Sequence, residues 1–292
     1  MAILNTFHFH KPVSLKEAVE LHENYGPQAS YIAGGTDVIV GLKKNKLEPG
    51  HLISLLNIPG LNHISSDGKE LHIGALTTHR QLEMNEEIGQ KFSVLHDAVK
   101  QIGSVQIRNV ATLGGNLCSA LPSADSASPL LVLNAKIKTA GVKNRILAIN
   151  DFFVGPGQSA LEPSEIVTEI IIPYPHQRSG AAYVKLGRRG AMEIPLIGAA
   201  VYFEVDELGF CTKARVALTT AAPTPIRVPN AEAALEGKKL NQDVFRSCAE
   251  RALLDASPRT SWRTTAEHRR AVIPVLVERA CAISLARIEQ SS

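Results

Sequence analysis

Two Gly-Gly pairs, far apart in the chain, constrain its fold more than any other feature. The first lies in AGGTD at 33–37, between a short strand-like run and a helical one. Without Cβ atoms the backbone N–H groups of such a segment can converge on an anion, and a following helix start adds partial positive charge. The Thr36 hydroxyl is a further donor. A single Gly-Gly is more often a tight turn with positive φ, so this segment alone leaves both readings open.

The second pair lies in TLGGN at 112–116, within a polar stretch rich in small residues. A pyrophosphate contains two phosphates, so two such segments side by side would form a natural receptor for it. Asp125 follows closely, and its carboxylate could accept hydrogen bonds from a ribose hydroxyl. The alternative is that Asp125 caps a helix beginning near Ser126.

Composition excludes several classes of protein. Of the 292 residues, 45% are apolar and 20% charged, which is typical of a folded chain and not of a disordered one. The formal net charge is only +3 and aromatic residues make up 5%, so a nucleic-acid interface is disfavoured. The four cysteines are widely spaced, which predicts neither a metal site nor a disulfide framework. No apolar run is long enough for a membrane span, and we expect a cytoplasmic protein.

The order of short strands and helices predicts an α+β fold. Ser14 and Glu17 form a capping-box pattern at a helix start, and Asp67-Gly68 indicates a hairpin turn. An irregular stretch is expected over 108–128. A domain boundary is expected at the Pro-Tyr-Pro segment 173–175. Beyond it we expect antiparallel strands at 182–186, 198–205 and 213–218, followed by helices at 230–235, 242–255 and 265–288.

Common catalytic motifs are missing from the sequence. It contains no HExxH, CxxC, GxSxG, Walker P-loop or GxGxxG pattern. His8 and His10 would lie on one face of a strand, but no third metal ligand is placed near them. We therefore predict no catalytic side chain and no metal site.

Several segments, in the same order, resemble one family. They are AGGTD at 33–37, IGALTT at 73–78, QIRNVATLGGNLCSALPSAD at 106–125, DFF at 151–153, LEPSEIVTEIIIP at 161–173, YVKLGRRGAMEI at 183–194 and AEHRR at 266–270. The family is the FAD-binding medium subunit of molybdenum hydroxylases, which includes carbon monoxide, xanthine and nicotinate dehydrogenases. The resemblance covers essentially the whole chain. It implies a FAD-binding domain of the PCMH/vanillyl-alcohol-oxidase type, with subdomains at 1–60 and 61–175, and a C-terminal antiparallel sheet-and-helix domain at 176–292.

The resemblance also assigns roles by position. It places the FAD pyrophosphate at 32–37 and 112–116, the ribose or adenosine at Asp125, and the adenine near Leu161. It places Lys185 near the flavin or its electron acceptor, and Ile194 against the isoalloxazine ring. Without the resemblance, these last two would be a surface lysine and an ordinary core isoleucine. The residues assigned to the cofactor are Ile32, Ala33, Gly34, Gly35, Thr36, Asp37, Thr112, Leu113, Gly114, Gly115, Asn116, Asp125, Leu161, Lys185 and Ile194.

The resemblance implies an electron-transfer flavoprotein with FAD as its only resident cofactor. A molybdopterin-binding large subunit and a 2Fe-2S small subunit would be its partners, in a dimer of heterotrimers. Electrons would pass to NAD or another acceptor. The hydroxybenzoyl-CoA reductase branch has an inserted cysteine-rich segment that this sequence lacks, which disfavours that activity. The alternatives are a stand-alone flavin oxidase or reductase of the same fold and a structural subunit without flavin.

Overall fold

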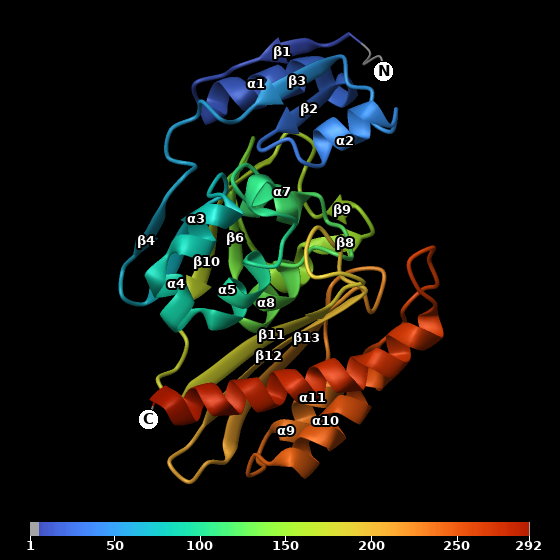
Figure 1. Cartoon of the computed structure of the whole chain (residues 1–292). Helices are drawn as coiled ribbons and strands as arrows, with labels where there is room; N and C mark the ends of the chain where they lie inside the picture. Colours follow the sequence, from blue (N-terminus) through green and yellow to red (C-terminus); the bar gives the residue numbers. More distant parts are fainter. Residues whose placement is uncertain (1–5, 292) are drawn as a thin grey trace.

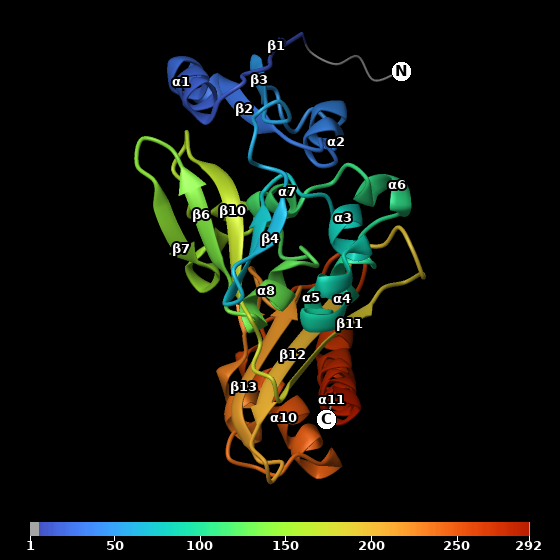
Figure 2. The same cartoon turned by 90° about the vertical axis from the view of Figure 1, so that its left-hand side faces the viewer.

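The computed structural model describes residues 6–291, and within them the chain builds three sheets of three or more strands (Figure 1). A small N-terminal sheet lies at one end, a five-stranded sheet in the middle and a four-stranded sheet at the other end. The turned view shows the same succession, with the long C-terminal helix beside the last sheet (Figure 2). The division into domains at residues 60 and 175 stays a prediction.

The N-terminal sheet has the strand order β1-β3-β2, and its strand pairs are parallel. The capping-box pattern marks a helix start as predicted, since the Ser14 hydroxyl accepts the N–H of Glu17 at 3.2 Å. The loop after β2 carries the first Gly-Gly pair to the edge that faces the central sheet. The elements here are β1 (His8–His10), α1 (Leu15–Tyr25), η1 (Gly26–Gln28), β2 (Ala29–Ile32), α2 (Val38–Lys43) and β3 (His51–Ser54).

The central sheet is antiparallel, in the order β4-β5-β10-β6-β7, and β8 pairs with β9 beside it. The predicted turn at Asp67-Gly68 joins β4 to β5, with Gly68 at φ +84°. The strands and the 3₁₀ helix of this part are β4 (Ile64–Ser66), β5 (Glu70–Gly74), β6 (Lys136–Ala140), β7 (Arg145–Ala148), η2 (Ile149–Asp151), β8 (Phe153–Gly155), β9 (Gln158–Ser159) and β10 (Ile166–Pro173).

Short helices lie between β5 and β6, where the sequence predicted an irregular stretch over 108–128. That prediction is wrong in part, because this stretch contains α7 and the start of α8. Thr112 begins α7 by accepting the N–H of Gly115 on its hydroxyl at 3.1 Å, a cap that offsets part of the low helix propensity of the two glycines. The helices are α3 (His79–Met84), α4 (Glu86–Lys91), α5 (Ser93–Val99), α6 (Val105–Arg108), α7 (Leu113–Cys118) and α8 (Ala127–Val132).

The third sheet is antiparallel in the order β11-β12-β13-β14 and is covered on both faces. Along β12, Ala200 and Tyr202 join the core of the central part, while Val201 and Phe203 join the core under the C-terminal helices. The elements are β11 (Ser179–Leu186), β12 (Ile197–Val205), β13 (Cys211–Thr219), β14 (Ile226–Arg227), α9 (Pro229–Leu235), α10 (Gln242–Asp255) and α11 (Ala266–Ser291).

Burial on both faces explains the apolar run at 194–203. A strand covered on both sides needs apolar residues at every position instead of at alternate ones. The run suits a strand packed behind the flavin, and the strand itself was predicted at 198–205. It begins at Ile197, while Ile194, the first residue of the run, lies in the preceding loop with 40% of its surface exposed.

An ion pair ties the C-terminal helix to the central part. Arg287 of α11 contacts Asp97 of α5 in a two-pronged geometry, with Nη1–Oδ2 at 2.7 Å and Nη2–Oδ1 at 3.0 Å. Burial raises the pKa of Asp97, but Arg287 and Lys100 outweigh it and hold that pKa below its ordinary value. The carboxylate therefore stabilises the fold at neutral pH, and this contribution is lost as the pH falls through the lowered pKa.

We expect Asp97→Asn to lower the free energy of unfolding by about 2 kcal/mol at pH 7, because a charged hydrogen-bonded pair is lost. The loss should shrink as the pH falls below about 4, where the carboxyl of the unfolded chain becomes protonated, and disappear below the lowered pKa of the folded state. Urea unfolding at both pH values measures this. Asp243→Asn is the control, since its side chain is 91% exposed beside Arg246. An equal effect of both substitutions would contradict the role given to Asp97.

Candidate functional site

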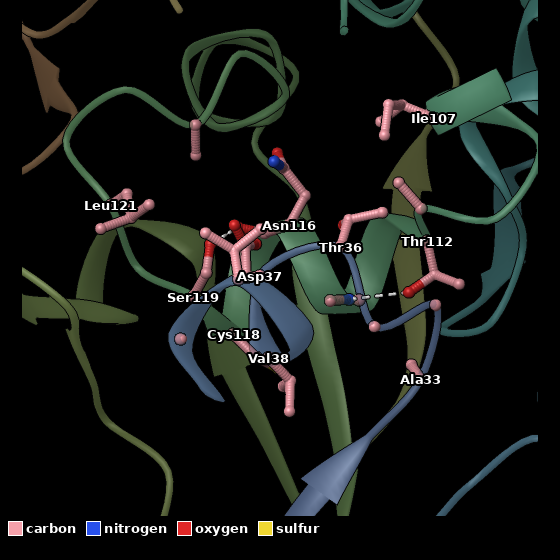
Figure 3. Close-up of a pocket in the computed structure, with 18 of the residues that line it drawn as sticks. Ala33, Thr36, Asp37, Val38, Ile107, Thr112, Asn116, Cys118, Ser119 and Leu121 are labelled. Atoms are coloured by element: carbon pink, nitrogen blue, oxygen red, sulfur yellow. Dashed lines mark hydrogen bonds between the residues drawn. The ribbon is translucent and has the colours of Figure 1, made fainter. Parts of the chain in front are cut away.

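A cavity of about 930 Å³ lies between the N-terminal sheet and the central part of the chain. Its size is in the range typical of cofactor sites. One wall comes from the β2–α2 loop and another from α7, and Figure 3 shows Ala33, Thr36 and Asp37 facing the helix that bears Asn116 and Cys118. The two Gly-Gly segments of the sequence therefore line one cavity.

The two glycine loops approach each other so closely that one of them requires glycine. A Cβ atom built on Gly34 would lie 1.8 Å from the carbonyl oxygen of Val110 and 3.1 Å from the Cα of Ala111. Both are backbone atoms just before Thr112, so no side-chain rotation could relieve the overlap. Gly34 is what allows the β2–α2 loop to lie against the segment that leads into α7.

The β2–α2 loop offers backbone donors to a ligand. Gly35 has φ +74°, a left-handed conformation suited to glycine, and its carbonyl accepts the N–H of Ile39 at 2.9 Å. Within residues 6–291 no acceptor takes up the N–H groups of Gly35, Thr36 or Asp37. Consecutive unpaired amides in a loop are the kind of donor that suits an anion.

The second glycine loop differs from what the sequence predicts. We expected its amides to point at a phosphate, but the fold uses them. The N–H of Leu113 binds the Thr77 carbonyl at 3.0 Å, and that of Gly114 binds the Ala75 carbonyl at 2.9 Å. Gly115 donates to the Thr112 hydroxyl (Figure 3). This loop therefore contributes shape and side chains, among them Asn116, to the cavity wall, while the free amides come from the first loop.

Asp125 lines the cavity but is already hydrogen-bonded on both oxygens. Tyr183 donates to Oδ1 at 2.7 Å and the Lys185 ammonium to Oδ2 at 2.9 Å. Burial raises the pKa of Asp125, with Lys185 and Tyr183 acting against it. The carboxylate does not cap α8, the alternative considered from the sequence, because α8 has no side-chain cap.

Lys185 lies behind the cavity wall and does not line it. Its side chain is only 6% exposed. Besides Asp125 it donates to the carbonyls of Gln101, at 3.2 Å, and Glu193, at 2.9 Å. Glu193 and Ile194 both belong to the wall, so Lys185 fixes the segment that carries Ile194. Its place supports a positioning role and not direct contact.

Glu165 lies at another part of the wall, which also contains Leu161 and Gly157. Burial raises the pKa of Glu165, but the Arg145 guanidinium and the Thr139 hydroxyl outweigh it, so the pKa is below its ordinary value. Arg145 also donates to the Ala160 carbonyl at 2.9 Å, which holds the segment before Leu161. Leu161 is half-buried and presents an apolar surface to the cavity.

The structure brings most of the residues assigned from the sequence to one place. Ile32 and Leu113 are buried in the core beneath the loops, and Lys185 lies behind the wall. The cavity is also lined by residues that were not assigned from the sequence. Some had a signal there: Ile107 and Met192 lie inside the segments at 106–125 and 183–194, and His79 directly follows the segment at 73–78. The assigned residues in the wall are Ala33, Gly34, Gly35, Thr36, Asp37, Thr112, Gly114, Gly115, Asn116, Asp125, Leu161 and Ile194, and the missed ones include His79, Ile102, Gly103, Ile107 and Met192.

A cavity of about 930 Å³, lined by a loop with unpaired amides and by apolar side chains, suits a dinucleotide-like cofactor. The family model described as FAD binding domain in molybdopterin dehydrogenase matches residues 5–175. The model of the CO dehydrogenase flavoprotein C-terminal domain matches residues 181–283.

Similar proteins and solved structures agree with these two family models. The chain is 35% identical over 281 residues to the xanthine dehydrogenase FAD-binding subunit of Escherichia coli O157:H7, covering 95% of this chain and 96% of that one. It is 31% identical over 286 residues to the carbon monoxide dehydrogenase medium chain of Afipia carboxidovorans, covering 98% and 99%. A chain of carbon monoxide dehydrogenase from Hydrogenophaga pseudoflava superimposes with a TM-score of 0.94 at 31% identity, covering 98% and 99%.

The chain therefore belongs to the family of FAD-binding subunits of molybdenum hydroxylases, which are oxidoreductases. The predicted fold class, a FAD-binding part followed by a C-terminal sheet-and-helix domain, is confirmed. FAD is the cofactor of this subunit, and molybdopterin and iron–sulfur clusters belong to other subunits of such complexes. Across the part of the chain that the structure describes, no helix has both the length and the apolar character that a membrane crossing requires.

Proposed function

We propose that this chain holds FAD in the cavity between its glycine loops and carries electrons from an iron–sulfur subunit to NAD or another acceptor. The observation that supports it most is the meeting of the two Gly-Gly segments, with the unpaired amides of Gly35, Thr36 and Asp37 in residues that line the cavity. These donors suit the diphosphate of FAD. Bound flavin supplies the ability to take up single electrons and to give up two as a hydride.

In this proposal, the rest of the chain orients the cofactor. The residues at 33–37 would bind the diphosphate, and Thr112 and Asn116 would lie on its other side. Leu161 would contact the adenine. The segment that Lys185 fixes would place Ile194 against the flavin ring. Met192 and Ile194 are 52% and 40% exposed, so this part of the wall also borders solvent, where an electron donor or acceptor could approach.

The partners expected from the family are part of the proposal. They are a molybdopterin-binding large subunit and a 2Fe-2S small subunit, in a dimer of heterotrimers located in the cytoplasm. The relatives named above are described as a FAD-binding subunit and a medium chain, which supports an assembly of several chains. The organic substrate would be bound by the large subunit.

Visible spectra of the purified chain test the cofactor and the acceptor. We expect the chain to retain equimolar FAD through gel filtration and to show the yellow flavin absorbance. If NAD is the acceptor, NADH added without oxygen should bleach that absorbance, whereas a quinone-linked subunit would be bleached only by a chemical reductant. A well-folded, colourless chain that takes up no added FAD would overturn the proposal.

A tagged copy expressed in the native host tests the partners. We expect it to co-purify with an iron–sulfur chain and a molybdenum chain. A chain that purifies alone, holds FAD and oxidises small molecules by itself would instead be a stand-alone flavin enzyme.

A further inference from the structure

His79 is a fully buried side chain in the wall of the cavity. It is the first residue of α3 and is 0% exposed. The backbone N–H of His79 donates a hydrogen bond to the carbonyl of Ala111 at 2.9 Å, and Ala111 belongs to the segment that lies against Gly34. The backbone of His79 is therefore anchored beside the place where Gly34 meets the segment leading into α7.

Neither ring nitrogen of His79 has a hydrogen-bond partner within residues 6–291. A buried polar atom without a partner carries an unrecovered desolvation cost, and most such atoms in folded proteins are satisfied. Nearby Arg108 offers no remedy, because its guanidinium is bonded to Glu83 and to the Ile102 carbonyl. Because His79 is among the residues that line the cavity, a ligand bound there is the candidate partner for this imidazole.

The imidazole is uncharged at neutral pH. Burial, together with the positive charge of Arg108, lowers the pKa of His79 to about 4. A neutral imidazole has one nitrogen that donates and one that accepts. Its complement is a ligand group that accepts, such as a phosphate oxygen, or one that both donates and accepts, such as an alcohol hydroxyl.

We infer that the imidazole of His79 hydrogen-bonds the ribityl–diphosphate part of bound FAD. This inference rests on the proposed function. The choice of this part of FAD follows from position, because the backbone of His79 is bonded to Ala111, which lies against Gly34 in the loop whose free amides suit the diphosphate. A ribityl chain carries hydroxyls and a diphosphate carries acceptor oxygens, so either satisfies a nitrogen that the protein leaves unpaired. His79 would be a positioning and binding residue, not one that transfers electrons.

Replacing His79 by leucine should have opposite effects on the FAD-free and the FAD-loaded protein: it should not lower the stability of the first, but it should weaken cofactor binding in the second. In the FAD-free chain, His79→Leu removes two unpaired polar atoms from a buried place, so its thermal midpoint should equal or exceed that of the wild type. In the loaded chain it removes a hydrogen bond to the cofactor, so the Kd for FAD should rise about tenfold. A residue with only a packing role would not produce this combination.

His79→Gln tests whether the loss is one of hydrogen bonding. Its amide also donates and accepts, so FAD affinity should return to within about threefold of the wild type. His72→Leu is the matched control, since His72 is a half-buried histidine on β5 beside Glu169 and does not line the cavity. Fluorescence titration of the full chain with FAD measures all four Kd values.

A measurement on the wild type covers the case in which a variant does not fold. With ring nitrogens labelled in histidine, one imidazole signal should move when FAD is added, and His79→Gln identifies it. An unchanged Kd in His79→Leu, or a glutamine variant as weak as the leucine variant, would overturn the inference while the proposed function stands. Failure of the wild type to bind FAD would overturn both.

Discussion

Gly34→Ala should weaken FAD binding more than any of the other single substitutions. The added Cβ would lie 1.8 Å from the Val110 carbonyl oxygen and 2.6 Å from its carbon, and both atoms belong to the backbone. Because side chains cannot move to relieve this contact, the β2–α2 loop must shift away from the segment at 110–112. We expect at least a roughly 100-fold rise in the Kd for FAD, and about 1–3 kcal/mol lost from the free energy of unfolding through overpacking.

A second glycine in the same chain provides the control. Gly89 lies inside α4, where a Cβ would meet nothing closer than the His96 ring at 4.0 Å. Gly89→Ala should leave FAD binding unchanged and raise stability by up to about 1 kcal/mol, since alanine has the higher helix propensity. Flavin absorbance after gel filtration and urea unfolding of both variants measure the effects. Wild-type FAD content in Gly34→Ala would show that the cofactor does not depend on the contact between the loops.

Much of the fold follows from local patterns in the sequence. The helix start at Ser14, the turn at Gly68 and the antiparallel strands after residue 175 are all present, because capping, turn chemistry and apolar runs act over a few residues. The apolar run at 194–203 extends beyond its strand, which begins only at Ile197, and the reason is non-local. An apolar run does not reveal that the third sheet is covered on both faces, nor where its strand pairing ends.

The candidate site could be predicted in outline only. The Gly-Gly segments indicated that two loops would meet, and they line one cavity. Which amides remain free depends on pairing partners, and those of Leu113 and Gly114 come from residues 75–77, far away in sequence. His79 could not be selected from the sequence either, since its unpaired nitrogens follow from tertiary burial and not from its neighbours.

The role expected for Lys185 from the sequence differs from the one that its buried pair with Asp125 supports. Lys185 was expected near the flavin or its electron acceptor. Its ammonium instead donates to Asp125 and to the carbonyls of Gln101 and Glu193. Lys185 and Asp125 side chains are only 6% and 8% exposed. Lys185→Met should therefore lower the free energy of unfolding by about 3–5 kcal/mol at pH 7, because it leaves a buried carboxylate without its cation.

The pH dependence of this loss identifies Asp125 as its cause. Burial already raises the pKa of Asp125, and removing Lys185 removes an opposing influence, so the pKa rises further. A carboxyl whose pKa is higher in the folded than in the unfolded state destabilises the fold as the pH rises through that interval. The deficit of Lys185→Met should therefore be smallest near pH 4 and grow toward neutral pH.

Two further variants separate the charge from the loss of a long side chain. In Lys185→Met/Asp125→Asn the carboxylate is gone, so the pH-dependent part of the deficit should disappear and part of the stability should return. Lys138→Met is the matched single control, because Lys138 is 52% exposed beside Glu169 and should cost no more than about 1 kcal/mol. Urea unfolding between pH 4 and pH 8 measures all of them. A pH-independent deficit in Lys185→Met would mean that its stem packing, and not the charge on Asp125, holds the segment at 193–194 in place.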